Sequence, residues 1–305
     1  RTKITYSYTR MNKLFIILFF FNYTFGLESY SFHTEFGQCQ LINHGFTFSN
    51  DDLKKIIKNK ISKLKNNFNP HFNPVEFLFI VDSNNIKVSN PHWKWSLGIT
   101  YYKPEKIIIK DPSVSHISKN HFKQVVEHEL NHLMINRINN TKSIPRWFKE
   151  GVAMFYADEI SFHHKLKVAQ YLKNKQNLNV NDLMTIRNVN KKDFQLAYAK
   201  SAIYVLSISE IYGNNALKAI IENLNQGYNF NQSFYNATSQ SINEFNSIIS
   251  SYIKSKYWWF KLITLPNKIF TFLPVLLVLG FVLQSYKNKK IKERWEQEEL
   301  ESLEE

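Results

Sequence analysis

The run His128-Glu129-Leu130-Asn131-His132 contains the residues best suited to chemistry in this chain. Two histidines four positions apart lie on one face of a helix, about one turn from each other. Both imidazoles can therefore reach a single Zn²⁺ ion, and Glu129 projects beside that ion, where it can hold a water molecule. The pattern predicts a zinc site with a built-in base. The alternative is a solvated helix face on which the two histidines are incidental.

The residues around this run predict the helix that the site needs. Ser118 is suited to the N-cap position, and Asn139 and Asn140 interrupt the pattern at the other end. Apolar residues recur between them at helical spacing: Phe122, Val125, Val126, Leu130, Leu133 and Met134. We therefore expect one face of this helix to pack against a core. A second helix is expected to begin near Ile144-Pro145, because proline suits the first helical turn.

A zinc ion that keeps one position open for water needs a third protein ligand. Glu150 is the candidate, 18 residues after His132 and among apolar neighbours of the second helix. An unpaired carboxylate in such surroundings is costly to bury, and a metal ion would compensate its charge. Asp158 and Glu159 are weaker rivals, and an exposed Glu150 is the alternative. The metzincin pattern is excluded, because its third histidine is replaced by Ile138.

The sequence resembles a known family through these motifs. The run from His128 to His132, followed by Pro145-x-Trp147-x-x-Glu150-Gly151-x-Ala153, is similar to the gluzincin metallopeptidases of the peptidase MA-like group. The similarity continues through 197–201, 210–213 and 227–230 and covers roughly residues 90 to 255. It implies a zincin-like α+β domain, Zn²⁺ as cofactor on His128, His132 and Glu150, and peptide or protein substrates.

The chemistry that these residues would perform is peptide hydrolysis. Zinc lowers the pKa of a bound water toward about 7, and Glu129 would take the proton as general base. A tetrahedral intermediate also needs a hydrogen-bond donor, a role that tyrosine can fill. Tyr198 is preferred because it lies in the family-like stretch, and Tyr204 is a weaker alternative. The competing interpretation is that both tyrosines are packing residues.

The part before the zinc helix, residues 27–117, reads as a small α+β lobe, and residues 118–255 read as mostly helical. The lobe is expected to contain an amphipathic helix at Asp51–Lys65, a buried strand at Val75–Val81 and a hairpin spanning 98–109. The resemblance implies that the strand Ile107–Lys110 borders the cleft and pairs with the substrate backbone. An internal sheet strand is the alternative for that segment.

The N-terminal residues have features of an export signal. Met11 reads as the natural start, Asn12-Lys13 as a short basic region and Leu14–Phe21 as an apolar core. Small residues at Thr24 and Gly26 predict cleavage before Leu27, so that residues 1–26 would be upstream residues and signal peptide. Retention of this segment as an anchor is the alternative.

A second apolar stretch, residues 269–286, predicts one transmembrane helix that contacts the lipid bilayer. Aromatic residues at 257–260 fit the membrane interface, and the basic run 287–292 fits the cytoplasmic side. A buried core helix is the alternative. The expected organisation is therefore a periplasmic or extracellular domain at 27–255, a juxtamembrane and membrane segment at 256–286, and a charged cytoplasmic tail at 287–305.

Composition excludes several other classes of protein. Cys39 is the single cysteine, so the chain has no internal disulfide and no cysteine zinc site. The formal net charge of +14 comes with no nucleic-acid-binding motif, and we expect no nucleic-acid partner. A basic domain outside the cytoplasm could also lie against an anionic membrane surface.

Together these features predict a membrane-anchored, zinc-dependent metallopeptidase. The main rival is a catalytically inactive zinc-binding or scaffold domain, which the presence of Glu129 disfavours because such a module has no use for a base. The third possibility is a membrane-anchored helical domain with incidental histidines, which predicts no stoichiometric zinc.

Overall fold

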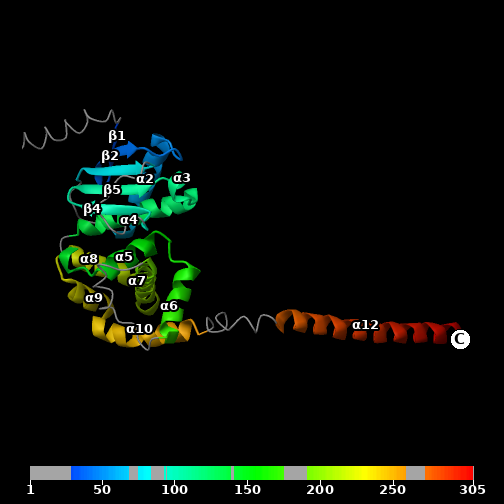
Figure 1. The fold of residues 1–305 in the computed structure, drawn as a ribbon. Helices are drawn as coiled ribbons and strands as arrows, with labels where there is room; N and C mark the ends of the chain where they lie inside the picture. The colour runs from blue at the N-terminus through cyan, green and yellow to red at the C-terminus, as the bar shows by residue number, and fades with distance from the viewer. Residues whose placement is uncertain are drawn as a thin grey trace, which may run out of the picture. The chain divides into compact units, whose positions relative to one another are not determined.

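A computed structural model of the chain describes residues 29–68, 75–83, 93, 95–138, 141–174, 191–258 and 272–304 (Figure 1). The chain divides into two compact units, Arg1–Lys254 and Ser255–Glu305. The first unit combines one β-sheet with a set of helices, so the predicted α+β class, with a small sheet lobe and a mostly helical part, is confirmed. The predicted signal segment, 12–26, lies outside the described residues.

A five-stranded mixed sheet forms the first lobe, in the order β1-β2-β3-β5-β4. Its strands are β1 (Tyr30–Thr34), β2 (Gly37–Asn43), β3 (Phe77–Asp82), β4 (Gly98–Tyr102) and β5 (Glu105–Lys110). β3 pairs in parallel with both β2 and β5, whereas β1 and β4 are antiparallel to their neighbours. The predicted strand at 75–81 and the predicted hairpin are both present, as β3 and as β4–β5.

Strand β5 lies inside the sheet, between β3 and β4. Ile107 and Ile109 are fully buried, and each backbone edge of the strand is paired. The expectation that Ile107–Lys110 presents a free edge to substrate is therefore wrong, and the internal-strand alternative is correct. β4 takes the edge position instead, next to the helix that carries the histidines.

Two helices pack beside this sheet, α2 (Asn50–Phe68) and α4 (Lys119–Asn136). α2 buries an apolar stripe at helical spacing, which is the face predicted for the helix at 51–65: Leu53, Ile57, Ile61 and Leu64. α4 contacts α2 on one side and both β4 and β5 on another. A short helix, α3 (Pro112–Ser115), precedes it. The predicted zinc helix thus packs against both the sheet and α2.

Helices make up the rest of the first unit (Figure 1). They are the 3-10 turn η1 (Thr141–Ser143), α5 (Arg146–Tyr156), α6 (Phe162–Asn174), α7 (Lys191–Tyr212), α8 (Ala216–Asn225), α9 (Phe230–Thr238) and α10 (Ile242–Lys256). α5 packs closely on α7 because Gly151 has no side chain: a Cβ there would lie 2.3 Å from the Ser201 carbonyl oxygen. This close approach fixes the helix that carries Glu150.

The second unit contains α12 (Phe272–Glu304). Among the residues that the structure describes, no helix has both the length and the apolarity that crossing a bilayer requires. The predicted span at 269–286 begins outside the described residues and continues into α12, which becomes charged from Lys287 onward. The prediction of a transmembrane helix is therefore not supported.

Candidate metal centre

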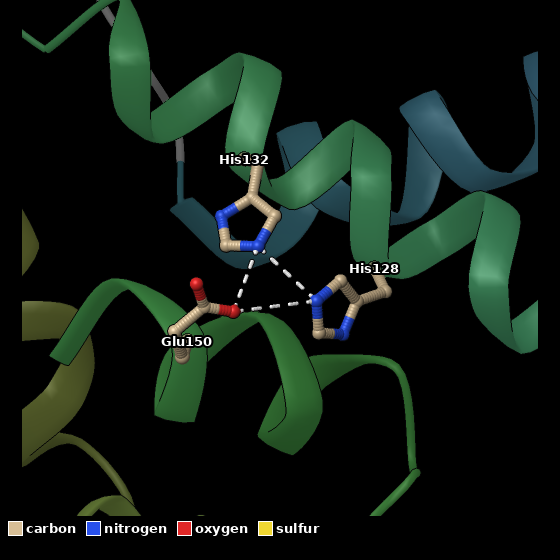
Figure 2. A group of neighbouring side chains, drawn as sticks. All are labelled: His128, His132 and Glu150. Carbon is tan, nitrogen blue, oxygen red and sulfur yellow. Dashed lines mark hydrogen bonds and ion pairs between the residues drawn. The ribbon is translucent and has the colours of Figure 1, made fainter. Parts of the chain in front are cut away.

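The two histidines of α4 face one point in front of the helix. Ser118 caps α4, its Oγ accepting a hydrogen bond from the His121 backbone N–H at 3.1 Å, as the sequence predicted. The Nε2 atoms of His128 and His132 lie 3.1 Å apart, with their rings edge to face. Both imidazoles are therefore turned toward each other through the nitrogens that can bind a metal (Figure 2).

Glu150 reaches the same point from α5. The helix begins directly after Pro145, which places Glu150 in its second turn. Glu150 Oε2 lies 3.2 Å from His132 Nε2 and 3.8 Å from His128 Nε2 (Figure 2). Within the described part of the chain, these three residues are the group whose ligand atoms converge as a metal site requires. The structure thus brings together the three residues that the sequence suggested as ligands.

The geometry and chemistry of this cluster fit Zn²⁺. Zinc–ligand distances of about 2.0–2.1 Å in a tetrahedron place neighbouring ligand atoms about 3.3 Å apart, close to the separations found here. Glu150 Oε2 is buried and has no hydrogen-bond partner, which is costly unless a cation meets it. Two imidazoles and one carboxylate also form a common catalytic zinc donor set that leaves a fourth position open.

The electrostatics of the cluster show how strongly these groups interact. Burial alone would raise the pKa of Glu150, but the adjacent His132 and His128 hold that pKa well below its ordinary value. Burial would likewise lower the pKa of His128, but the carboxylates of Glu159 and Glu150 hold it well above its usual range. The pocket therefore favours a carboxylate next to a cation, and a metal ion can take the place of the proton.

Glu159 holds the ring of His128 from behind. Its Oε2 lies 2.8 Å from His128 Nδ1, on the side of the ring away from the cluster. This contact keeps hydrogen on Nδ1 and leaves the Nε2 lone pair available for a metal. Glu159 and Asp158, the rivals considered for third ligand, are both outside the ligand group. Asp158 instead pairs with Lys63 at 3.3 Å.

Glu129 is buried beside the histidines and is held by the edge strand β4. The Thr100 hydroxyl donates a hydrogen bond of 2.6 Å to Glu129 Oε2. Gly98, two residues earlier and on the same face of the strand, leaves room for the carboxylate, because a Cβ there would lie 2.7 Å from Glu129 Oε1. Burial raises the pKa of Glu129, which makes it a stronger base than an exposed glutamate.

Tyr198 and Tyr204 have different surroundings on α7. Tyr198 lines a cleft of about 630 Å³ together with Gly98, His128 and Glu129. Burial raises its pKa well above the ordinary value, and the nearby Glu150 carboxylate adds to the shift, so the phenol keeps its proton. Tyr204 is fully buried against Trp147, with ring centroids 5.5 Å apart. Tyr198 therefore faces the site, and Tyr204 lies in the core.

Sequence comparison matches residues 63–255, more than half of the chain, to the Peptidase MA superfamily. The chain belongs to the Peptidase MA superfamily. The resemblance drawn from the His128–His132 run and the Glu150 helix is thus confirmed. No curated protein matches the chain.

Solved structures similar to this Peptidase MA superfamily member include an aminopeptidase N family protein and an M1 zinc metallopeptidase. An aminopeptidase N family protein from Idiomarina loihiensis is 14% identical, with a TM-score of 0.48 over 73% of this chain and 46% of that one. A mutant M1 zinc metallopeptidase from Deinococcus radiodurans is 10% identical, with a TM-score of 0.46 over 73% and 52%. That enzyme bound to a Tyr-Ser-Ala substrate is 11% identical, with a TM-score of 0.43 over 74% and 52%. The chain spans about half the length of these structures.

The sequence of this superfamily member did not reveal which residues support the ligands. Thr100 and Gly98 were assigned only to a hairpin, and Glu159 only to a rival ligand position. Their signals were a Gly-x-Thr step in the strand before the zinc helix and an acidic residue just after α5. Neither signal shows by itself that the side chain meets Glu129 or His128.

Proposed function

We propose that this chain is a zinc-dependent peptidase that hydrolyses peptide bonds in peptides or proteins. The observation that carries the proposal is the convergence of His128, His132 and Glu150, with the carboxylate of Glu129 held beside them at the edge of a cleft. Superfamily membership supports the same reaction class. A buried base next to three ligands has a use only if a water molecule is to be activated there.

Each residue has a defined role in the proposed reaction. Zn²⁺ held by His128, His132 and Glu150 would polarise the substrate carbonyl and acidify the attacking water. Glu129, fixed by Thr100, takes a proton from that water and passes it to the departing amine. The protonated phenol of Tyr198 donates a hydrogen bond to the developing oxyanion.

The alternatives predicted from the sequence fit the structure less well. A domain with incidental histidines gives no reason for Nε2 atoms 3.1 Å apart beside a buried carboxylate oxygen without a hydrogen-bond partner. An inactive zinc-binding scaffold gives no reason for the cradle of Gly98 and Thr100 around Glu129. That scaffold is the second candidate function, and loss of turnover separates it from an enzyme.

The test uses the full chain loaded with zinc and a peptide library read by mass spectrometry. We expect about one zinc per chain in the wild type and in Glu129→Gln, since Glu129 is not a ligand. Glu129→Gln should lower cleavage by about 10²–10⁴-fold. Glu222→Gln is the matched control, because Glu222 is exposed on α8. Zinc-loaded wild type that cleaves no library peptide would favour the scaffold, and cleavage unchanged in Glu129→Gln would rule out the proposed base.

We also propose that the domain acts outside the cytoplasm. The support is the signal-like sequence at 12–26, with its basic start and apolar core. Fusing residues 11–30 to a reporter enzyme that is active only outside the cytoplasm tests this. An inactive reporter would contradict the proposed location without affecting the proposed reaction.

A further inference from the structure

One wall of the cleft is formed by the start of α6. Ser161, His163, His164 and Lys167 line the cleft there, together with Gly98 of β4. The turn that carries Asp158 and Glu159 connects this wall to α5 and hence to Glu150. A substrate bound at the metal centre in this cleft would therefore meet side chains of α6.

The carboxylates that line the cleft are already engaged. Within the described part of the chain they are three: Glu129 accepts from Thr100 at 2.6 Å, and Glu159 contacts His128 Nδ1 at 2.8 Å. Asp158 pairs with Lys63 at 3.3 Å. Each of these carboxylates thus already has a hydrogen-bond or ion-pair partner in the protein. A cationic group of a substrate would compete with those partners.

Lys167 is in the opposite situation. Its Nζ donates to the Oε1 atom of Gln195 at 2.8 Å, and Gln195 is a neutral amide that also lines the cleft. Among the described residues, Lys167 forms no ion pair with a carboxylate, whereas Lys63, whose partner Asp158 lines the cleft, pairs with Asp158 and Glu127. In the part of the chain that the structure describes, the ammonium group therefore lines the cleft with a neutral amide, and not a carboxylate, as its partner.

His164 adds a hydrogen-bond donor to the same wall. The backbone N–H of Ser161 donates to His164 Nδ1 at 3.1 Å. Nδ1 therefore accepts, and a neutral ring must carry its hydrogen on Nε2. Burial lowers the pKa of His164, which keeps the ring neutral near pH 7. The wall thus offers a cation and an N–H donor, a combination that binds carboxylates well.

We propose that Lys167 and His164 bind an anionic group of the substrate, a carboxylate close to the scissile bond. The carboxylate can come from an Asp or Glu side chain or from the C-terminus of a peptide. This inference rests on the proposed peptidase function and names its substrate class as peptides that carry a carboxylate close to the scissile bond. Because Lys167 and His164 are partly exposed, the attraction is screened by salt.

The test compares quenched fluorescent peptides that differ at single positions flanking one cleavable bond, with Glu, Gln or Lys at each. A second pair of peptides has its C-terminus close to the cleavable bond, as a free carboxylate in one peptide and as an amide in the other. Comparing the two pairs shows whether the bound carboxylate belongs to a side chain or to the C-terminus. We expect wild type to favour the anionic member at one of these positions by about tenfold in kcat/KM, and less at high salt. Lys167→Gln should bring the preference close to one, and Lys167→Glu should reverse it toward Lys.

Lys165→Gln is the matched control, since Lys165 lies on the same helix but outside the cleft lining, and its preference should equal that of wild type. Equal rates of wild type on Glu and Gln peptides, or an unchanged preference in Lys167→Gln, would overturn the inference while the peptidase proposal stands. Calorimetric binding of the same peptides to zinc-loaded Glu129→Gln measures the preference without turnover. If no peptide is cleaved, the proposed peptidase function is wrong. Equal calorimetric binding of Glu and Gln peptides would refute the inference about Lys167 and His164 independently of cleavage.

Discussion

Helix α4 carries two glutamates, two residues apart, whose surroundings differ in kind. Glu127 is almost fully buried and pairs with two ammonium groups of α2, those of Lys60 and Lys63, the second at 2.8 Å. Glu129 is also buried, but it is held by a neutral hydroxyl of Thr100. Lysine side chains stay charged at neutral pH, whereas a hydroxyl provides no compensating charge. One carboxylate is neutralised by the fold itself, and the other keeps its basicity.

The two histidines of α4 show the same contrast with the Glu127 cluster. His128 and His132 face Glu150, and imidazoles are cations only when protonated. The charge of Glu150 is therefore balanced by a proton or by a metal ion. The charges of Glu127, Lys60 and Lys63 balance one another whether or not a metal ion is bound. The charge of the three-ligand cluster of His128, His132 and Glu150 is balanced only when a proton or a metal ion binds there. Variants on the two sides should accordingly fail in different ways.

The largest expected effect is the loss of metal in Glu150→Ala. Removing one of three protein ligands should reduce bound zinc from about one per chain to near zero at micromolar protein, and peptide cleavage should fall with it. The measurement is metal analysis after gel filtration, together with the cleavage assay. Zinc retained at full stoichiometry would mean that another residue is the third ligand.

Glu127→Ala should damage stability and leave the metal site intact. Removing the buried carboxylate leaves Lys60 and Lys63 without their shared partner and creates a cavity at the α2–α4 contact. Removing one partner of a buried ion pair lowers the free energy of unfolding by about 3–5 kcal/mol. Because both lysines are partly exposed, we expect a loss of about 3 kcal/mol. Denaturant unfolding of metal-free protein measures this loss, with Glu222→Ala as the exposed control. A loss of zinc stoichiometry in folded Glu127→Ala would contradict the separation of the two regions.

The sequence predicted the parts of the site whose spacing is local. His128 and His132 are four residues apart on one helix, so helix periodicity placed them on one face. Glu150 followed from the need for a third zinc ligand and from the family-like stretch of the next helix. The contact of Thr100 with Glu129 and that of Lys63 with Glu127 join residues 29 and 64 positions apart. Such contacts depend on how β4 and α2 pack against α4, and a single sequence carries no periodic signal for them.

The fold shows the same limit. The apolar run at 75–81 predicted β3, but strand order is a tertiary property, so the edge position of β4 could not be read from 98–109. The strands β1 and β2 were not predicted: Tyr30–Thr34 does alternate between exposed and buried positions, but a run of five partly polar residues is too short for that alternation to stand out in the sequence. The apolar stretch at 269–286 was interpreted as a span from its composition and from the aromatic and basic residues on either side of it. Among the described residues, α12 does not have the length of apolar sequence that a span requires.

Thr100→Val should show what the neutral partner of Glu129 contributes. Valine keeps the shape of threonine but removes the donor, and a hydrogen bond to a charged group contributes about 1.5–3 kcal/mol. We therefore expect kcat to fall by about 20-fold, with KM and zinc content close to wild type, because the base loses its orientation while the ligands remain. Thr100→Ser should restore most of the rate. A change confined to KM, or no rescue by serine, would assign Thr100 to substrate binding or to packing.

The smallest expected effect concerns pH and applies only to the three-ligand cluster. The pKa of His128 is held well above its ordinary value, although burial opposes this, because Glu159 and Glu150 favour the charged ring. In metal-free protein this adds stability that is fully present below about pH 6.5 and is lost as the pH rises through the folded pKa. Zinc must displace that proton, so its affinity should increase by about tenfold per pH unit over the same window.

Chelator competition between about pH 6.5 and 8.5 measures this slope, and metal-free unfolding curves supply the opposite trend. Glu159→Gln removes the charge that holds the proton on His128, so the slope should weaken. It also removes the group that orients the ring, so zinc should bind about tenfold more weakly at the upper end of the range. A zinc affinity independent of pH in both proteins would mean that His128 is neutral before the metal arrives. In that case the cluster would resemble the Glu127 side of α4, with its charges settled by the fold alone.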